Sequence, residues 1–121
     1  MAASRSGLRN ARTGAWLAGD LRTARSFWTR GVGLLGRAAL PPGEGLYIDS
    51  CNSIHSLFMR FPFDAVFVDR EWRVVHLIRA MPAFRISRIV WRAHGVVELP
   101  AGTVARTGTQ VGDALEVVDG S

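Results

Sequence analysis

Apolar and polar residues alternate over much of the chain after residue 45, and a two-residue period is typical of strands with one buried face. Pro62 interrupts the longest such run, and because proline lacks an amide hydrogen it marks a sheet edge or a bulge. Trp72–Arg79 alternates more regularly, so we expect Val74 and His76 to share one face. The pattern predicts strands over 13–17, 46–48, 57–68, 72–79, 95–99 and 114–118.

Helical spacing of apolar residues occurs only from Ala24 to Arg37, where three glycines indicate a short helix or one packed closely against a sheet. Pro100–Gly108 is predicted as a loop or one helical turn, and residues 86–91 as a strand or an irregular segment. Turns are predicted at Asp69–Glu71 and at Gly112–Asp113. Strands therefore dominate, with one or two short helices, and we predict an α+β domain built on an antiparallel sheet.

The length of 121 residues corresponds to one domain, which we expect over residues 13–121 after a flexible N-terminus at residues 1–12. With 48% hydrophobic and 21% charged residues, the chain is too apolar for intrinsic disorder. Its longest apolar stretches reach about five residues, against ~20 in a membrane-spanning helix, so we expect no membrane span. Cys51 is the single cysteine and excludes an internal disulfide, and no secretory signal is recognisable; both observations favour the cytoplasm.

All 15 basic residues are arginine, and the formal net charge is +5. Such complete exclusion of lysine indicates coding bias or adaptation to heat more than a phosphate-binding surface, which usually contains both residue types. The densest basic cluster consists of Arg85, Arg88 and Arg92, with Trp91 beside them, and it is the best candidate for a nucleic-acid patch. We favour a solvated arginine face there and do not expect nucleic acid as the main partner.

Four residues that can carry chemistry, Cys51, His55, Arg60 and Asp64, fall within 14 residues of one another. A thiol beside an imidazole can ionise and act as a nucleophile, with a carboxylate to orient the base. Cysteine and histidine are also zinc ligands, but structural zinc sites usually need two such close pairs, and we expect neither a metal nor another cofactor. The simpler interpretation, which we favour, is a buried Cys51 and a hydrogen-bonded His55 in a loop.

Two further carboxylate interpretations remain open. Arg60 and Asp64 could form a structural ion pair or present a guanidinium to an anionic ligand, and we favour the first. Glu98 lies among apolar residues and is either the outward-facing residue of a strand, which we favour, or an acid in a pocket. The predicted ligand-binding residues are Cys51, His55, Arg60, Asp64 and Glu98.

Two segments, GLLGRAALPPGEGLYIDSCNSIHSLFMRFPFDAVFVD (Gly33–Asp69) and VVELPAGTVARTGTQVGDALEV (Val96–Val117), resemble domain-of-unknown-function family 192 of prokaryotes. The resemblance covers most of the chain, although Phe63 stands where a smaller aliphatic residue is commoner. It implies a compact single-domain α+β fold with a barrel-like, mainly antiparallel sheet. It implies no established reaction, cofactor or partner.

Motifs that would identify an activity are missing, including GxGxxG, GxxxxGK[ST], GxSxG and HExxH. We therefore predict a small accessory or ligand-binding module with a polar pocket around Cys51, His55, Arg60 and Asp64, for a small-molecule or protein ligand. The alternative is a small enzyme that uses Cys51 or His55 as nucleophile or base. A third hypothesis is a nucleic-acid binder that uses the cluster of Arg85, Arg88 and Arg92.

Overall fold

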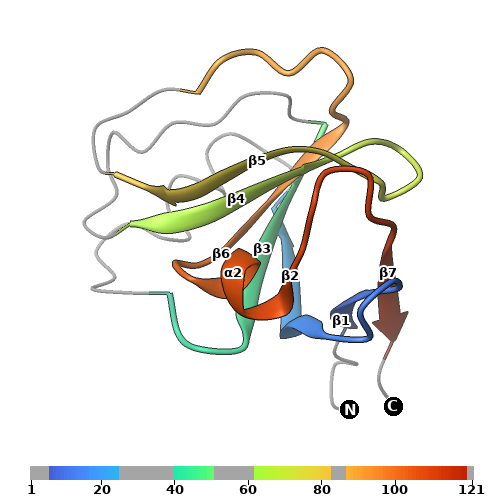
Figure 1. Ribbon diagram of the computed structural model, residues 1–121, viewed down its shortest axis with the longest axis vertical. Helices are drawn as coiled ribbons and strands as arrows, with labels where there is room; N and C mark the ends of the chain where they lie inside the picture. The colour runs from blue at the N-terminus through green and yellow to red at the C-terminus, as the bar shows by residue number, and fades with distance from the viewer. Residues whose placement is uncertain (1–5, 25–39, 51–61, 83–86, 120–121) are drawn as a thin grey trace.

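Seven strands and one short helix build the part of the protein that the computed structural model describes, which is residues 6–24, 40–50, 62–82 and 87–119. The strands form one sheet in the order β5-β4-β6-β3-β2-β1-β7 (Figure 1). Their bounds are β1 (Ser6–Asn10), β2 (Trp16–Ala24), β3 (Glu44–Asp49), β4 (Phe63–Val68), β5 (Val74–Met81), β6 (Gly95–Pro100) and β7 (Leu115–Asp119). The helix α2 spans Thr103–Thr107.

All neighbouring strands are antiparallel except β2 and β3, which run parallel with Asp20 opposite Glu44. The predicted antiparallel sheet is therefore confirmed apart from this pair. Parallel neighbours need a crossover connection between them. The helix predicted over residues 24–37 would lie in that connection, but residues 25–39 are outside the described part of the chain.

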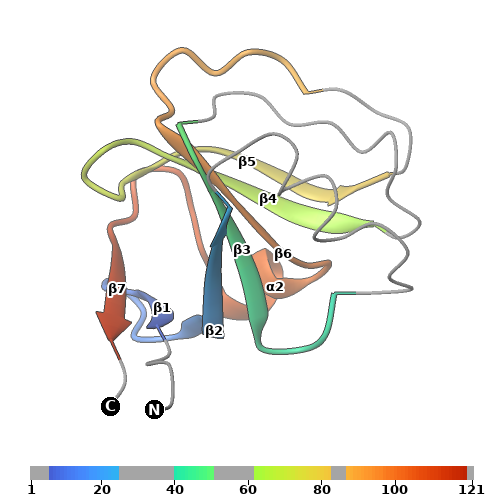
Figure 2. The ribbon, with the colours of Figure 1, turned by 180° about the vertical axis from the view of Figure 1, so that it is seen from behind.

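The sheet curls until its two outer strands meet at one corner. There, the Val74 amide donates to the Asp113 carbonyl at 2.8 Å, and the Leu115 amide donates to the Trp72 carbonyl at 2.9 Å. Arg73 and Ala114 form an antiparallel bridge between them. The result is a half-barrel, as the resemblance implies, and it is seen from both sides in Figures 1 and 2.

Both faces of the sheet are buried at its central strands β4 and β6. The concave face holds one apolar cluster, and α2 closes part of it by inserting Val104, which is fully buried. The convex face holds a second cluster, which Leu40 and Val90 cover from outside the strands. Residues that alternate along a central strand such as β6 therefore enter two separate apolar layers, and all residues from Gly95 to Leu99 are buried.

Several local signals predicted their elements correctly. Strand β5 ends directly before Pro82, as predicted. Strand β4 begins directly after Pro62, and the earlier part of the predicted strand, residues 57–61, lies outside the described part of the chain. The Asp69 turn forms because one carboxylate oxygen of Asp69 accepts the amides of Glu71 and Arg73, at 2.9 and 3.0 Å. The segment after Pro100 contains one helical turn, and the last strand begins one residue later than predicted.

Two local predictions were wrong. Val74 and His76 do not share a face, because a bulge in β5 lies between them: Val68 pairs with Val74, whereas Phe67 pairs with His76. Residues 13–15 are not part of a strand, and order does not begin near Thr13, since Ser6–Asn10 already form β1. The residues of β1 carry a weak strand pattern, and they are ordered by pairing with β2 and β7.

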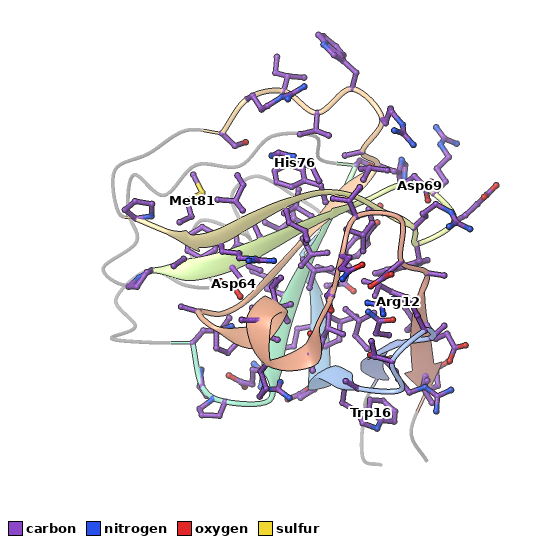
Figure 3. The ribbon with its side chains drawn as sticks, in the orientation of Figure 1. Arg12, Trp16, Asp64, Asp69, His76 and Met81 are labelled. Carbon is purple, nitrogen blue, oxygen red and sulfur yellow. The ribbon has the colours of Figure 1, made fainter. Side chains whose placement is uncertain are left out.

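A polar cluster joins the turn after β1 to the loop before β7. The Asp113 carboxylate accepts hydrogen bonds from the Arg12 guanidinium at 2.7 Å, the Asn10 amide at 2.9 Å and the Gln110 backbone amide at 2.8 Å (Figure 3). Although burial opposes the charge, the bond from Arg12, together with those from Asn10 and Gln110, lowers the pKa of Asp113 from 3.8 to about 2.

This pKa predicts how stability depends on pH. Because the pKa is lower in the folded state, the carboxylate stabilises the fold above pH 4, and this contribution is lost as the pH falls from about 4 to about 2. The Arg12 side chain is half exposed, so we expect the effect to be at most about 2 kcal/mol. Urea unfolding of the wild type and of Asp113→Asn should give free energies of unfolding that converge over this range. A constant difference between the two proteins from pH 6 to pH 2 would contradict the assignment.

Candidate functional site

Three of the residues predicted to carry chemistry, Cys51, His55 and Arg60, lie outside the described residues, as does Arg85. A Cys51–His55 pair and a pocket around these residues therefore stay predictions. Asp64 and Glu98 from the predicted set are described, together with Arg88 and Arg92 from the basic cluster.

Asp64 is buried on the concave side of β4, with 1% of its surface exposed. One carboxylate oxygen accepts the amide of Ala80 in β5 at 2.8 Å, and the other accepts the amide of Val104 in α2, also at 2.8 Å (Figure 3). These bonds fix two irregular backbone positions: Ala80, which has a positive φ of 48° beside a register shift in the β4–β5 ladder, and the start of α2, which Gly102 cannot cap because it has no side chain. Asp64 therefore joins three elements of the fold.

Glu98 lies on the convex side of β6, opposite Leu46 on one neighbouring strand and Ala65 on the other. Only 4% of its surface is exposed, so the expectation that it faces solvent was wrong. We expected successive side chains of this strand to point alternately to a buried face and to a solvated face, with Glu98 on the solvated one. This expectation fails because this sheet carries an apolar layer on each side.

A cleft of about 390 Å³ lies between the β4–β5 turn and the segment that leads into β6. The turn contributes Asp69, which Figure 3 labels, and the neighbouring Arg70 and Glu71. The segment before β6 contributes residues 91–94, with Trp91, Arg92 and His94 as its large side chains. The 80% exposure of Trp91 exceeds that of every other exposed large hydrophobic side chain among the described residues.

Backbone hydrogen bonds hold the second wall of the cleft in place. The His94 amide donates to the Val68 carbonyl at the end of β4, at 2.8 Å, and the Ala93 amide donates to the Val90 carbonyl at 2.9 Å. Val90 itself is buried in the convex core. The segment is irregular, yet the His94 hydrogen bond and the buried Val90 side chain attach it to the sheet, so the exposed side chains project from a supported backbone.

His94 also contacts the end of β3, where its Nε2 atom lies 3.3 Å from an Asp49 carboxylate oxygen. Both side chains are about one-third exposed. The next residue must be glycine, because a Cβ atom at Gly95 would overlap the Tyr47 ring. Together these contacts bring the ends of β3 and β4 and the start of β6 next to His94, which lines the cleft.

The cleft combines a flat aromatic surface with two guanidinium groups and one imidazole. Exposed indole rings bind apolar or planar groups, and arginine binds carboxylates and phosphates. Thiols, hydroxyls and amines are not found among the described residues that line it. Groups of three or more His, Cys, Asp or Glu that could hold a metal are likewise missing from the described part of the chain.

Sequence reasoning noted Trp91, Arg92 and the Asp69 turn separately but did not bring them together. The turn and the second wall are about 20 residues apart in the chain, and only the pairing of β4 with β6 makes them neighbours. The polar cluster of Arg12 and Asp113 was missed for the same reason, since these residues are 101 positions apart. Of these features, only the turn at Asp69 could be predicted from neighbouring residues in the sequence.

Comparisons with known proteins agree with this fold. The family model of domain-of-unknown-function family 192, whose description reads "Uncharacterized ACR", matches residues 8–117. The chain belongs to this family. The resemblance in the sequence is thereby confirmed, whereas no curated protein matches the chain.

Two solved structures share the fold of this member of the family. A candidate transcription regulator from Sinorhizobium meliloti is 25% identical, with a TM-score of 0.76 over 94% of this chain and 92% of that one. A protein of unknown function from Novosphingobium aromaticivorans is 20% identical, also with a TM-score of 0.76, over 92% of this chain and 82% of that one. The second likeness shows the fold alone.

The Asp64 geometry leads to a prediction about stability. In Asp64→Asn one of the two backbone amides loses its acceptor inside the core, because the two bonds use different oxygens, and we expect a loss of about 2–4 kcal/mol. Asp69→Asn is the matched control: it also accepts two backbone amides, but through one oxygen at a half-exposed position, and should lose under about 1 kcal/mol. Urea unfolding measures both. Equal losses would contradict the role assigned to Asp64.

Proposed function

We propose that the protein is a ligand-binding module and that the cleft between residues 69–71 and 91–94 is its binding surface. The observation that supports this most strongly is Trp91, which is 80% exposed beside Arg70 and Arg92 in a concave site. A tryptophan in a concave site beside two arginines is typical of a binding surface, where the indole ring acts as an anchor.

The side chains of the cleft favour a ligand that has an anionic group and an apolar or planar part. Arg70 and Arg92 are exposed, so their guanidinium groups can bind an anion without a large desolvation cost. Two of the nearby carboxylates already have partners: Asp69 accepts the turn amides, and Asp49 faces His94. Glu71 is exposed at the turn and should weaken anion binding, which makes it a useful position for a test.

Binding is favoured over catalysis because the described lining contains no thiol, hydroxyl or amine, and the Asp69 carboxylate already accepts the turn amides. We also propose that the predicted pocket around Cys51, His55, Arg60 and Asp64 contributes to ligand binding. The role of Asp64 in it would be to fix the backbone at Ala80 and Val104. Binding of nucleic acid through Arg85, Arg88 and Arg92 is a second candidate. The exposure of Arg88 and Arg92 and the naming of one structural neighbour as a candidate transcription regulator support it.

Titration of the 15N-labelled protein with inorganic phosphate, AMP and the oligonucleotide (dT)8 tests the cleft. We expect at least one probe to shift the Trp91 indole signal and the amides of residues 92–94. Arg92→Ala should weaken that binding about fivefold or more, Glu71→Gln should strengthen it, and Arg22→Ala, an exposed arginine on β2, should leave it unchanged. If no probe perturbs these residues, the cleft does not bind the proposed class of soluble ligand.

The enzyme alternative makes a separate prediction about Cys51. A nucleophilic thiol needs a lowered pKa and is alkylated rapidly near neutral pH, whereas a binding module has no such requirement. Cys51 is the only cysteine, so mass spectrometry after iodoacetamide treatment reports on this residue alone. We expect alkylation of the native protein to be no faster than that of the same protein unfolded in urea. Faster alkylation in the native state would favour the enzyme.

A further inference from the structure

We propose that the segment Arg88–Arg92 docks on an anionic membrane surface, with Ile89 and Trp91 at the level of the lipid headgroups and the arginines on their phosphates. This inference rests on the proposed function, because it names the ligand of the same cleft. It concerns attachment to a surface; in the part of the chain that the structure describes, no helix is long and apolar enough to cross a membrane.

The first support is the arrangement of apolar side chains in the segment. Ile89 is 46% exposed and Trp91 80% exposed, whereas Val90 between them is 6% exposed and packs in the convex core. The two outer side chains therefore project away from the sheet while the middle one anchors the segment. In Figure 1 this segment forms the uppermost edge of the molecule, above β5, where a flat surface could reach it.

The second support is charge. Arg88 and Arg92 flank the apolar pair, and Arg70 lies across the cleft; all three side chains are exposed. Two carboxylates near these arginines carry negative charge: Asp69, which accepts the turn amides, and the exposed Glu71. His94 lies beside the Asp49 carboxylate. The chain as a whole has a formal charge of +5. An arginine near an anionic bilayer contributes about 1 kcal/mol, so three such residues are sufficient for measurable attraction.

The combination of side chains favours lipid over the other anionic partners. Tryptophan is enriched at the boundary between headgroups and acyl chains, and arginine can extend from there to the phosphates. A nucleic acid would use the ring of Trp91 for stacking but has no use for the exposed aliphatic Ile89. A stable protein interface buries about 800 Å² on each partner, far more than two side chains provide.

Co-sedimentation with large unilamellar vesicles tests the inference. We expect binding to vesicles of phosphatidylcholine and phosphatidylglycerol (70:30) in 50 mM NaCl, little binding to pure phosphatidylcholine, and weaker binding in 300 mM NaCl. Trp91→Ala and Ile89→Ser should each reduce binding about tenfold, and Arg88→Ala or Arg92→Ala about fivefold. Circular dichroism checks that these surface variants are folded.

The chain provides a matched control for Trp91. Trp16 is 46% exposed and lies under the guanidinium of Arg9, 5.6 Å from the ring centroid, but Arg9 is paired with Glu116. Trp16 lies at the opposite end of the molecule's long axis from the segment 88–92 (Figure 3). Trp16→Ala should therefore bind vesicles like the wild type. Brominated lipids should quench the fluorescence of the wild type more than that of Trp91→Phe, because only the wild type has an indole at position 91, where we expect contact with the lipid.

The outcomes separate this inference from the proposed function. Vesicle binding that depends on Trp91 and Ile89 supports both. If phosphate, AMP or (dT)8 titrates the cleft while anionic vesicles do not bind, the ligand-binding module stands and the membrane inference is overturned. Binding of (dT)8 that depends on Trp91 and not on Ile89, without vesicle binding, indicates nucleic acid instead. If neither vesicles nor soluble probes perturb residues 88–94, both proposals are overturned.

Discussion

The carboxylate of Asp64 is the interaction on which the rest of the described structure depends most directly. Its two oxygens accept the amides of Ala80 and Val104 from inside the barrel, so one side chain connects β4, the end of β5 and the start of α2. A helix of five residues cannot be stable by itself, and its first residues have no capping side chain of their own. With α2 fixed in this way, Val104 closes the concave core, and the strands that carry the cleft can remain curled around it.

Two apolar layers on one sheet explain why the functional features lie where they do. The strands themselves are occupied with packing on both faces, so polar chemistry is displaced to the strand ends and to the segments that connect them. The cleft follows this rule, since it is built from the end of β4, the turn to β5 and the entry to β6. Two buried carboxylates in the sheet are exceptions: Asp64 on the concave side of β4, and Glu98, which lies in the convex layer between Leu46 and Ala65.

Local signals made much of the fold predictable. Pro82 marks the end of β5, the turn at Asp69–Glu71 was predicted, and β6 and β7 were predicted within one residue. Tertiary effects could not be read in this way. The bulge at Val75 reverses the faces of β5, and β1 is stabilised by partners from distant parts of the chain. For the candidate site, the sequence identified Asp64 and favoured Arg60 as its partner, but Arg60 lies outside the described residues and that pairing stays a prediction. Among the described residues Asp64 accepts two backbone amides, which leave no trace in a residue pattern.

The pairing of β1 with β7 has a consequence for how the chain acquires its structure. Ser6 and Asp119 are neighbours in the sheet and are separated by 113 positions in sequence. Closing a loop of that length has a large entropic cost that only the finished pairing repays, so a fold of this topology has a high contact order and should form slowly. During synthesis on the ribosome, β1 must wait without this neighbour until β7 has emerged. For that interval an unpaired strand edge at β1 is exposed to other chains, and the nascent protein depends on rapid completion or on a chaperone to avoid aggregation.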